Sequence, residues 1–498
     1  MEQRHEFDNE YTAQRHKHRQ EIETLAVDPF PGVVQREQTI ESVLAAHGEK
    51  DKETLEAEPV AVCVAGRVML NRPMGKAAFA TIQDGTGRLQ FYLRKDSVSE
   101  TEFQLYKKTD LGDFISASGE LFRTKTGELT IKVSKYQYLS KAYRPLPDKH
   151  AGLKDQELRY RHRSLDLLTN PEVKDRFVKR SQIIAGIREF MRARDYLEVE
   201  TPMMHPIPGG ATARPFVTHH NTLDMELYMR IAPELHLKRL IIGGMDRVFE
   251  INRNFRNEGI STQHNPEFTM MEWYEAYANL AVMQEMVESM IRGVVEKALG
   301  HTNVTYGEHE IDFGKPFASY TMKEAICKFG DYEASQLDEL ASLQDVAKKL
   351  HIEDGEKMEY GDLLAEVFEA VAEAHLIQPT FITEYPISIS PLTKKIPGKE
   401  GFVERFELFI GGMEVANAYT ELNDPVDQRE RFMDQMRQIE AGNDEAQRLD
   451  EDFLWAMEHG MPPTGGQGLG IDRLVMLLTN APSIRDVILF PLMRPHQD

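Results

Sequence analysis

Two strand-like runs between residues 247 and 274 carry residue types that could bind a charged ligand. Arg256 stands at the end of the first run, and the second reads FTMMEWY over residues 268–274. Alternate residues of a strand point to one face, so Phe268, Glu272 and Tyr274 would lie together. A stacking ring, a carboxylate and a phenol beside a guanidinium suit a nucleotide and a small cationic substrate. A structural sheet face is more often Val, Ile and Leu, so the pattern favours a ligand site over a polar core.

Two alternating runs within residues 405–424 flank a Gly-Gly pair, which predicts a β-hairpin with a two-residue turn. That register pairs Phe409 with Glu414 and Glu407 with Ala416, so the two glutamates become close neighbours. Close carboxylates repel each other unless a cation joins them. Mg²⁺ takes few protein ligands and shares the rest with phosphate and water, so the pair predicts a magnesium site.

Three further polar residues, Asn417, Tyr419 and Glu421, follow in the same run. Their parity is opposite to that of Glu414, so a straight strand would turn them to the other face of the sheet. If all four residues line one pocket, a bulge or bend must lie between them.

A glycine-rich segment, GGQGLGIDR at residues 465–473, leads into an apolar helix and is predicted to be a closing loop. Glycines allow the backbone to approach a ligand closely. The segment is not a Walker A loop, because no Gly-Lys-Ser/Thr ends it, and no βαβ unit surrounds it as a dinucleotide fingerprint requires. Arg473 at the start of the helix would add a second guanidinium for a polyphosphate beside Arg256.

Five β-rich runs separated by turn residues lie between residues 60 and 140 and predict a small Greek-key barrel. The OB-fold is the leading case, and it often binds single-stranded nucleic acid. Phe79, Phe91 and Tyr92 are candidate stacking residues, although some of them must fill the core. Residues 61–140 hold 12 Lys and Arg against 8 Asp and Glu, a net charge of +4 in a chain of net charge −22. The charge alone leaves nucleic-acid binding open.

The remaining elements predict an α+β fold. Helical patterns cover residues 1–27, 170–195 and 280–299, and an acidic helical insertion covers about residues 320–375. A strand at residues 196–204 contains Pro202, which belongs at a strand edge or a bulge.

The composition narrows the class of protein. Two cysteines, Cys63 and Cys327, exclude a disulfide framework and a four-cysteine zinc site, and they indicate a reducing compartment. No apolar run approaches the roughly 18 residues of a membrane helix, and the polar N-terminus has no secretory signal. We expect a soluble, cytoplasmic protein that does not bind a membrane.

Three segments together resemble the three motifs of class II aminoacyl-tRNA synthetases. YLEVETPMM at residues 196–204 resembles motif 1, FRNEG followed by HNPEFTMMEWY resembles motif 2, and GLGIDR resembles motif 3. A barrel before the catalytic domain is the arrangement of subclass b, which charges lysine, aspartate or asparagine. Residues 209–240 and 413–425 look like the bacterial lysyl-tRNA synthetases in particular. The resemblance runs from about residue 20 to the end of the chain.

The resemblance implies a fold and a division of the chain. A five-stranded OB-fold barrel would bind the anticodon, and a class II catalytic domain with an antiparallel sheet and flanking helices would follow. The implied parts are an N-terminal helix and lead-in at 1–59, the barrel at 60–145, a basic connector at 146–168 and the catalytic domain at 169–498. Motif 1 implies a homodimer.

The resemblance also implies the reaction and its residues. L-Lysine would be activated by ATP to lysyl-adenylate with release of pyrophosphate, and then transferred to the 3′ end of tRNA(Lys). Arg256 and Arg473 would be catalytic, and Glu407 and Glu414 would hold Mg²⁺. The implied ATP-binding residues are Arg256, Glu258, His264, Asn265, Phe268, Glu407 and Arg473. The implied lysine-binding residues are Gly210, Glu234, Arg256, Glu272, Tyr274, Asn417, Tyr419, Glu421 and Gly468. The implied anticodon-binding residues are Arg72, Phe79, Gln90 and Glu128.

The residues themselves also bear on the substrate and on rival functions. A buried ammonium needs carboxylates, whereas an aspartate pocket would need a cation where Glu421 stands. Asparagine is excluded less firmly. An enzyme that attaches lysine to a protein would lack the N-terminal barrel, and a non-catalytic RNA-binding module would have broken motifs. A purely structural protein would leave the acidic and aromatic residues unexplained.

Overall fold

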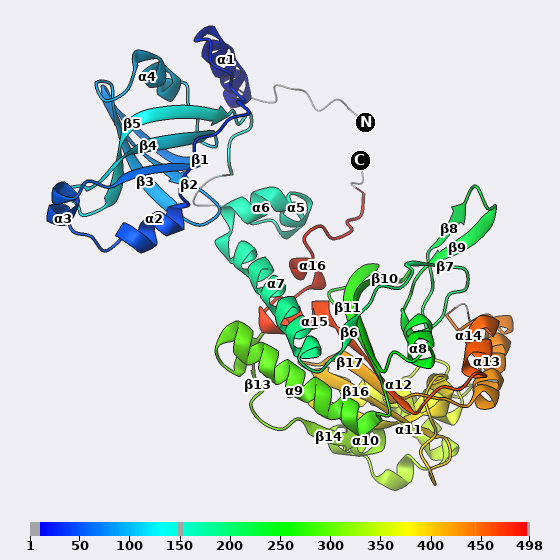
Figure 1. Ribbon diagram of the computed structural model, residues 1–498. Helices are drawn as coiled ribbons and strands as arrows, with labels where there is room; N and C mark the ends of the chain where they lie inside the picture. Colours follow the sequence, from blue (N-terminus) through cyan, green and yellow to red (C-terminus); the bar gives the residue numbers. More distant parts are fainter. Residues whose placement is uncertain (1–9, 148–152, 444, 496–498) are drawn as a thin grey trace. The chain divides into compact units, whose positions relative to one another are not determined.

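The computed structural model describes residues 10–147, 153–443 and 445–495 (Figure 1). The chain forms two compact units, residues 1–154 and 155–498, and each is built around its own hydrophobic core. Among the described residues, no helix is long and apolar enough to cross a membrane.

The first unit is a closed five-stranded barrel with the strand order β1-β2-β3-β5-β4. Its strands are β1 (Ala61–Met74), β2 (Ala77–Gln83), β3 (Arg88–Arg94), β4 (Phe114–Arg123) and β5 (Leu129–Ser140). Residues alternate between buried and half-exposed along β2 and β3, so one face of each strand fills the barrel. The predicted five-stranded barrel is confirmed.

Short helices accompany the barrel. They are α1 (Glu10–Thr24), α2 (Ile40–His47), α3 (Lys52–Ala57) and α4 (Glu100–Lys107). Side chains of Thr39, Asp51 and Ser99 cap α2, α3 and α4 by accepting bonds from backbone N–H groups. The helix predicted over residues 1–27 corresponds to α1, and residues 1–9 of that prediction lie outside the described part of the chain.

The prediction that Phe91 is a stacking residue of the barrel is wrong. Phe91 is 1% exposed and belongs to the barrel core, because it lies on the inward face of β3. Phe79 and Tyr92 lie on the outer face, with ring centroids 4.6 Å apart. The two rings therefore stay available as an aromatic surface.

The second unit is built on an eight-stranded sheet with the order β14-β15-β16-β17-β18-β11-β10-β6. The pairs at its two edges, β14–β15 and β10–β6, are parallel, and the other neighbours are antiparallel. The strands are β6 (Leu197–Glu198), β10 (Arg247–Phe255), β11 (Glu267–Ala276), β14 (Ala318–Thr321), β15 (Thr380–Pro386), β16 (Phe402–Ile410), β17 (Met413–Thr420) and β18 (Thr464–Gly470). Two small sheets, β12-β13 and β7-β9-β8, comprise β7 (Met204–His205), β8 (Val217–His220), β9 (Met225–Met229), β12 (Asn303–Tyr306) and β13 (His309–Asp312).

Two long helices, α7 (Pro171–Arg192) and α9 (Leu280–Leu299), cover one face of this sheet (Figure 1). Ile187 of α7 and Val287 of α9 pack with Trp273 of β11 in the main core. The opposite face carries α8 (Glu234–Ile242), whose Leu237 packs near Tyr274. The two faces of the central strands therefore have different neighbours, and the cavity described below opens on the face with α8.

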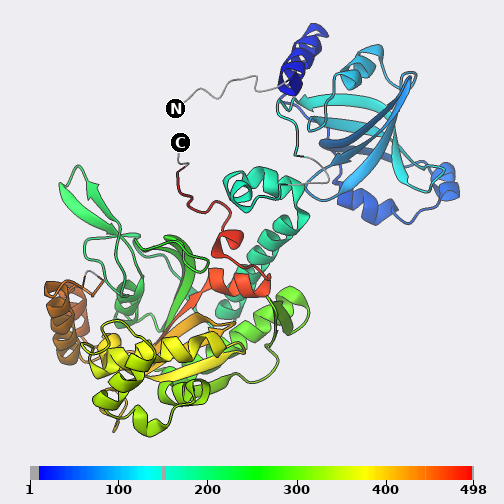
Figure 2. The ribbon, with the colours of Figure 1, turned by 180° about the vertical axis from the view of Figure 1, so that it is seen from behind.

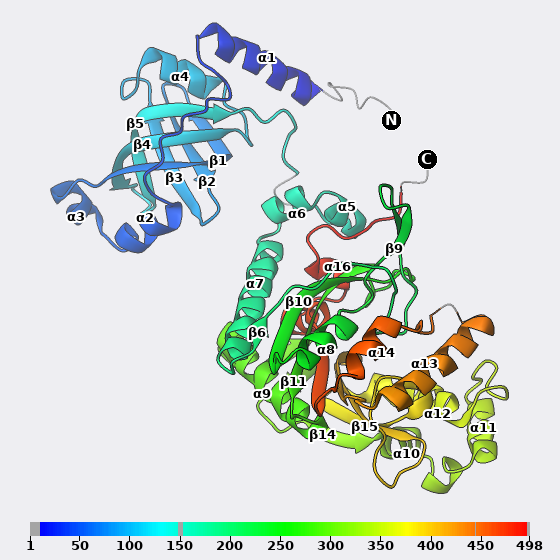
Figure 3. The same ribbon diagram turned by 45° about the vertical axis from the view of Figure 1, so that its right-hand side comes forward.

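The remaining helices of this unit lie at its margins. Figure 2 shows α10 (Met322–Gly330), α11 (Leu340–Lys349) and α12 (Tyr360–Val371) grouped at the β14–β15 edge, where they form a separate core. Figure 3 shows α13 (Pro425–Glu440) and α14 (Glu451–Met457) beside α8. Helices α5 (Gln156–Arg161), α6 (Arg163–Thr169), α15 (Ile471–Leu478) and α16 (Ile484–Val487) complete the unit. The expected helical character of residues 320–375 is confirmed.

The predicted boundaries differ in three places. The strand predicted at residues 196–204 is reduced to β6 and β7, and Pro202 lies between them because proline lacks the N–H that a strand ladder requires. The predicted connector contains α5 and α6, while residues 148–152 of it lie outside the described part. Buried Arg163 donates to the carbonyl of Leu489, so these helices pack into the second unit. The glycine-rich segment predicted as a loop is strand β18, since glycines that carry no side chain can still pair by their backbone.

Candidate active site

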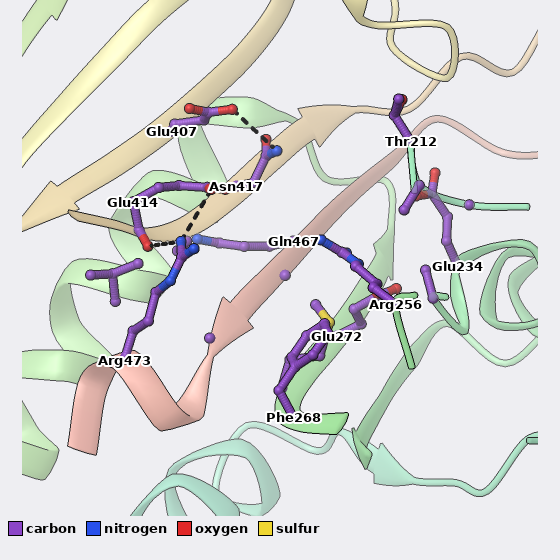
Figure 4. Close-up of a pocket in the computed structure, with 18 of the residues that line it drawn as sticks. Thr212, Glu234, Arg256, Phe268, Glu272, Glu407, Glu414, Asn417, Gln467 and Arg473 are labelled. Carbon is purple, nitrogen blue, oxygen red and sulfur yellow. Dashed lines mark hydrogen bonds and ion pairs between the residues drawn. The ribbon is translucent and has the colours of Figure 1, made fainter. Parts of the chain in front are cut away.

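A cavity of about 380 Å³ opens on the sheet face that carries α8 (Figure 4). Its lining comes from β11, β16, β17 and β18 and from the loops that follow β10 and precede α8. The structure brings together fifteen of the sequence-predicted residues of this unit in the lining: Gly210, Glu234, Arg256, Glu258, His264, Asn265, Phe268, Glu272, Tyr274, Glu407, Glu414, Asn417, Tyr419, Gly468 and Arg473. Glu421 is the exception. It is 1% exposed and lies behind the lining.

A β-bulge in β17 shapes this cavity. The hairpin turn has two glycines with positive φ, as a two-residue primed turn requires. Phe409 pairs with Glu414 as predicted, but Leu408 pairs with Ala416, which leaves Val415 as an extra residue. The bulge that the sequence required is therefore present.

The bulge reverses the parity of β17, so Asn417 and Tyr419 join Glu414 on the cavity face. It also moves the partner of Glu407, which lies opposite Asn417 and not opposite Ala416 as the regular register predicted. That prediction was wrong because it counted residues without the bulge.

Glycines at alternate positions of β18, namely Gly466, Gly468 and Gly470, make room for the cavity. This strand lies in the middle of the sheet, with Gly466 opposite Tyr274 and Gly468 opposite Glu272. A Cβ at Gly466 would lie 2.0 Å from Oε1 of Glu421 and 2.4 Å from the ring of Tyr274. Glycine at this position therefore lets two functional side chains approach the backbone.

Two arginines lie on either side of part of the cavity (Figure 4). The guanidinium of Arg256 lies 5.1 Å from the ring centroid of Phe268, and its Nε is buried without a hydrogen-bond partner. Arg473 donates to the backbone carbonyl of Glu414 at 2.6 Å and lies 3.0 Å from Nε2 of His264. Burial lowers the pKa of Arg256, and Arg473 lowers it further. An anion between the two guanidinium groups would remove this repulsion.

The two predicted metal ligands face the same end of the cavity as Arg473 (Figure 4). Burial raises the pKa of Glu407, the charge of Glu414 raises it further, and Arg405 lowers it. Glu407 accepts a bond from the hydroxyl of Tyr385 at 2.8 Å. The described residues contain no group of three or more His, Cys, Asp and Glu side chains that could enclose a metal ion. Two carboxylates that repel each other suit Mg²⁺, which takes few protein ligands and completes its shell with phosphate and water.

The other end of the cavity is acidic. Burial raises the pKa of Glu272 well above its usual range, and the charge of Glu234 adds to the rise. The hydroxyl of Tyr274 donates to Glu272 at 3.1 Å. Neighbouring carboxylates disfavour each other's charge, so a cation bound here would stabilise their ionised forms.

Two buried cations near the cavity were missed by the sequence analysis. Lys238 contacts Glu234 and Glu421 through its Nζ, and Arg405 pairs with Glu407 at 2.5 Å. The signals were present in the sequence. Lys238 stands four residues after Glu234, which is one helical turn, and Arg405 stands two residues before Glu407 on the same strand face.

The predicted anticodon-binding residues lie together on the outside of the barrel. Phe79 pairs with Arg72 across β1 and β2, and Nε2 of Gln90 donates to Glu128 at 2.9 Å. Tyr92 of β3 adds its ring beside Phe79. These side chains form one polar and aromatic patch on the first unit.

The chain matches known families over both units. Residues 155–494 match the family of class II tRNA synthetases (D, K and N), and residues 62–139 match the OB-fold nucleic acid binding domain. The lysine–tRNA ligase of Laribacter hongkongensis is 54% identical over 489 residues, which covers 98% of this chain and 97% of the relative. The lysine–tRNA ligase of an Enterobacter species is 55% identical over 94% of this chain and 93% of its own length.

The chain therefore belongs to the class II tRNA synthetases, and within them to the lysine–tRNA ligase family. The family and the fold class predicted from the sequence are confirmed.

The close approach at Gly466 generates a prediction about stability. Gly466→Ala should lower the free energy of unfolding of the second unit by about 1–3 kcal/mol, because the added methyl group must displace buried Glu421 and Tyr274. Both tryptophans of the chain, Trp273 and Trp455, lie in this unit, so tryptophan fluorescence in a denaturant series measures its unfolding.

Gly293→Ala is the matched control, because Gly293 lies in α9 with open space where a Cβ would be. It should leave stability unchanged or raise it slightly. Equal stability of the two variants would contradict the proposed crowding.

Proposed function

We propose that this chain is a lysine–tRNA ligase, which activates L-lysine with ATP and transfers it to the 3′ end of tRNA(Lys). The observation that carries this proposal is the polarity of the cavity. One end holds two arginines and a carboxylate pair, and the other holds buried carboxylates and phenols. A polyphosphate fits the first end and a diamino acid fits the second.

At the ATP end, Phe268 would stack on the adenine ring while Arg256 reaches the α-phosphate. The half-buried position of the Phe268 ring beside this guanidinium supports both roles. Glu258, His264 and Asn265, from the loop between β10 and β11, would contact the adenine and the phosphates. Arg473 would hold the γ-phosphate.

At the lysine end, Glu234 and Gly210 would bind the α-amino group. Gly210 has φ of +87°, and a Cβ there would lie 2.9 Å from Cβ of Glu234, so glycine permits this close approach. Asn417 and Arg256 would hold the carboxylate. Glu272, Tyr274 and Glu421 would bind the ε-ammonium, with Tyr419 and Gly468 completing the walls.

The reaction needs no protein nucleophile. A carboxylate oxygen of lysine attacks the α-phosphorus in line, the bond from that phosphorus to the bridging oxygen breaks, and pyrophosphate leaves with the electron pair. Arg256 stabilises the charge that develops on the α-phosphate, and Arg473 stabilises the leaving group. Glu407 and Glu414 would hold Mg²⁺, which supplies further neutralisation of the phosphates when bound. A terminal ribose hydroxyl of the tRNA then attacks the carbonyl carbon of the lysyl-adenylate, which is a mixed anhydride. The bond from that carbon to the phosphate oxygen breaks, AMP leaves with the electron pair, and the hydroxyl proton is released.

The remaining parts of the proposal concern partners. The outer barrel patch, with Arg72, Phe79, Gln90 and Glu128, would read the anticodon by stacking and by contacts with base edges. We infer a homodimer from the resemblance of residues 196–204 to motif 1, and a cytoplasmic location from the reduced cysteines. Four domains would correspond to residues 1–59, 60–145, 146–168 and 169–498.

The test of the function is amino-acid-dependent exchange between ATP and pyrophosphate, measured with all twenty amino acids. Exchange should occur with lysine, and Glu421→Gln should lower kcat/KM for lysine at least about 100-fold, because removing one partner of a buried charge pair is costly. Glu308→Gln, in the exposed turn between β12 and β13, should leave exchange unchanged. Exchange with aspartate or asparagine instead of lysine would overturn the proposed specificity, and no exchange would overturn the activity.

The same groups predict a pH dependence. Burial raises the pKa of Glu421 to about 8, although Lys238 lowers it. A carboxyl that is protonated below this pH binds an ammonium poorly, so KM for lysine should fall about tenfold per unit between about pH 6 and 7 and become constant above about pH 8. KM for ATP serves as the internal reference. A flat lysine profile across this range would contradict the assignment of Glu421.

A further inference from the structure

A lysine side chain is buried inside the chain beside the acidic end of the cavity. Lys238 of α8 is fully buried, and its Nζ lies 2.5 Å from Oε1 of Glu234 and also contacts Oε2 of Glu421. These two carboxylates come from separate elements, the first residue of α8 and the residue after β17. One ammonium group therefore joins two elements of the unit directly behind the cavity.

The second oxygens of the two carboxylates remain for a ligand. Oε1 of Glu421 is buried with no hydrogen-bond partner, and it points toward Gly466 and Tyr274. Glu234 lines the cavity, and Lys238 takes only its Oε1. Lys238 thus binds one oxygen of each carboxylate and leaves Oε1 of Glu421 and the second oxygen of Glu234 for another cation.

The charges at this end then match a molecule with two ammonium groups. Glu234, Glu272 and Glu421 carry three negative charges when ionised, and Lys238 cancels one of them. Two negative charges remain, which is the number of ammonium groups that lysine brings, while Arg256 matches the lysine carboxylate. Buried charges that are not matched are costly, so without Lys238 one carboxylate would stay protonated or unpaired.

We propose that Lys238 is a positioning residue that determines specificity: it fixes the separation of the α-amino and ε-amino subsites and sets the charge of the site to that of a diamino acid. This proposal rests on the proposed function of lysine activation. Burial lowers the pKa of Lys238, but the two carboxylates outweigh this effect and keep it an ammonium.

A merely structural ion pair is the alternative, and the barrel supplies an example. Lys141 is fully buried and bridges Asp110 at 2.5 Å and Asp113 at 2.7 Å. It lies in the first unit, among residues that do not line the cavity. Lys141→Met is therefore a matched control, since it removes a buried ammonium from between two carboxylates elsewhere in the same protein.

The test uses the full-length Lys238→Met variant in the exchange reaction with ATP and pyrophosphate. KM for lysine should rise about 10- to 100-fold while KM for ATP stays within about twofold, and the preference for lysine over the shorter ornithine should fall about tenfold. The pH at which KM for lysine becomes constant should also move upward, because Lys238 lowers the pKa of Glu421. The other ionisable groups around this pair are Glu234 on α8, Glu272 and Tyr274 on β11, Tyr419 on β17 and Arg405 on β16.

The control and a second variant keep the outcome decisive. Lys141→Met should leave the lysine profile and the ornithine ratio unchanged. Lys238→Arg retains the positive charge in a different shape, so it should keep the pH profile and alter the ornithine ratio. This second variant tests the proposal even if Lys238→Met does not fold. An unchanged ornithine ratio in Lys238→Arg would overturn the proposal.

The failure of this proposal is distinct from failure of the proposed function. Absence of lysine-dependent exchange in the unchanged protein would overturn the function. Only the role of Lys238 would be overturned if the unchanged protein exchanges normally with lysine and Lys238→Met has the same KM, pH profile and ornithine ratio.

Discussion

The cavity depends on one physical constraint, which is the cost of burying like charges close together. Glu234, Glu272 and Glu421 lie at one end of the site. Burial raises the pKa of each of them, and the charge of Glu234 raises the pKa of the other two further. At the other end, burial and the charge of Arg473 lower the pKa of Arg256. The carboxylates at one end therefore need a cation, and the two guanidinium groups at the other end need an anion. A ligand with cations at one end and phosphates at the other resolves both, which makes binding energy available for orientation.

The backbone meets this constraint through two irregularities. The bulge at Val415 turns the polar residues of β17 beyond that point toward the cavity, and the alternate glycines of β18 carry no side chains there. Neither feature stabilises a sheet by itself, because a bulge interrupts the ladder and glycine loses packing. The main core on the opposite face, where α7 and α9 cover Trp273 and Leu469, holds the sheet in spite of them. Stability and function are thus divided between the two faces of the same strands.

Much of this arrangement could be predicted from the sequence, because period-two patterns and paired glycines are local signals. Helix α9 ends at Gly300 as expected, and the face of β11 that carries Glu272 follows from alternation alone. The register of Glu407 could not be predicted, since the position of a bulge depends on tertiary packing. The inward position of Phe91 was missed although the sequence carries its signal, because Leu89, Phe91 and Leu93 alternate with polar residues along β3.

Arg405 links the two ends of the cavity. It pairs with Glu407, the proposed magnesium ligand, and donates from Nε at 3.2 Å to Asn417, a proposed lysine-binding residue. Its Nη1 donates to the carbonyl of Ile389 and to the hydroxyl of Ser390, both at 2.9 Å, and these bonds fix its position. Because one guanidinium holds both side chains, neither can shift without the other. Under the proposed function, Asn417 would hold the lysine carboxylate and Glu407 the magnesium ion. The alignment of both groups would then depend on one cation that the protein already holds by four hydrogen bonds.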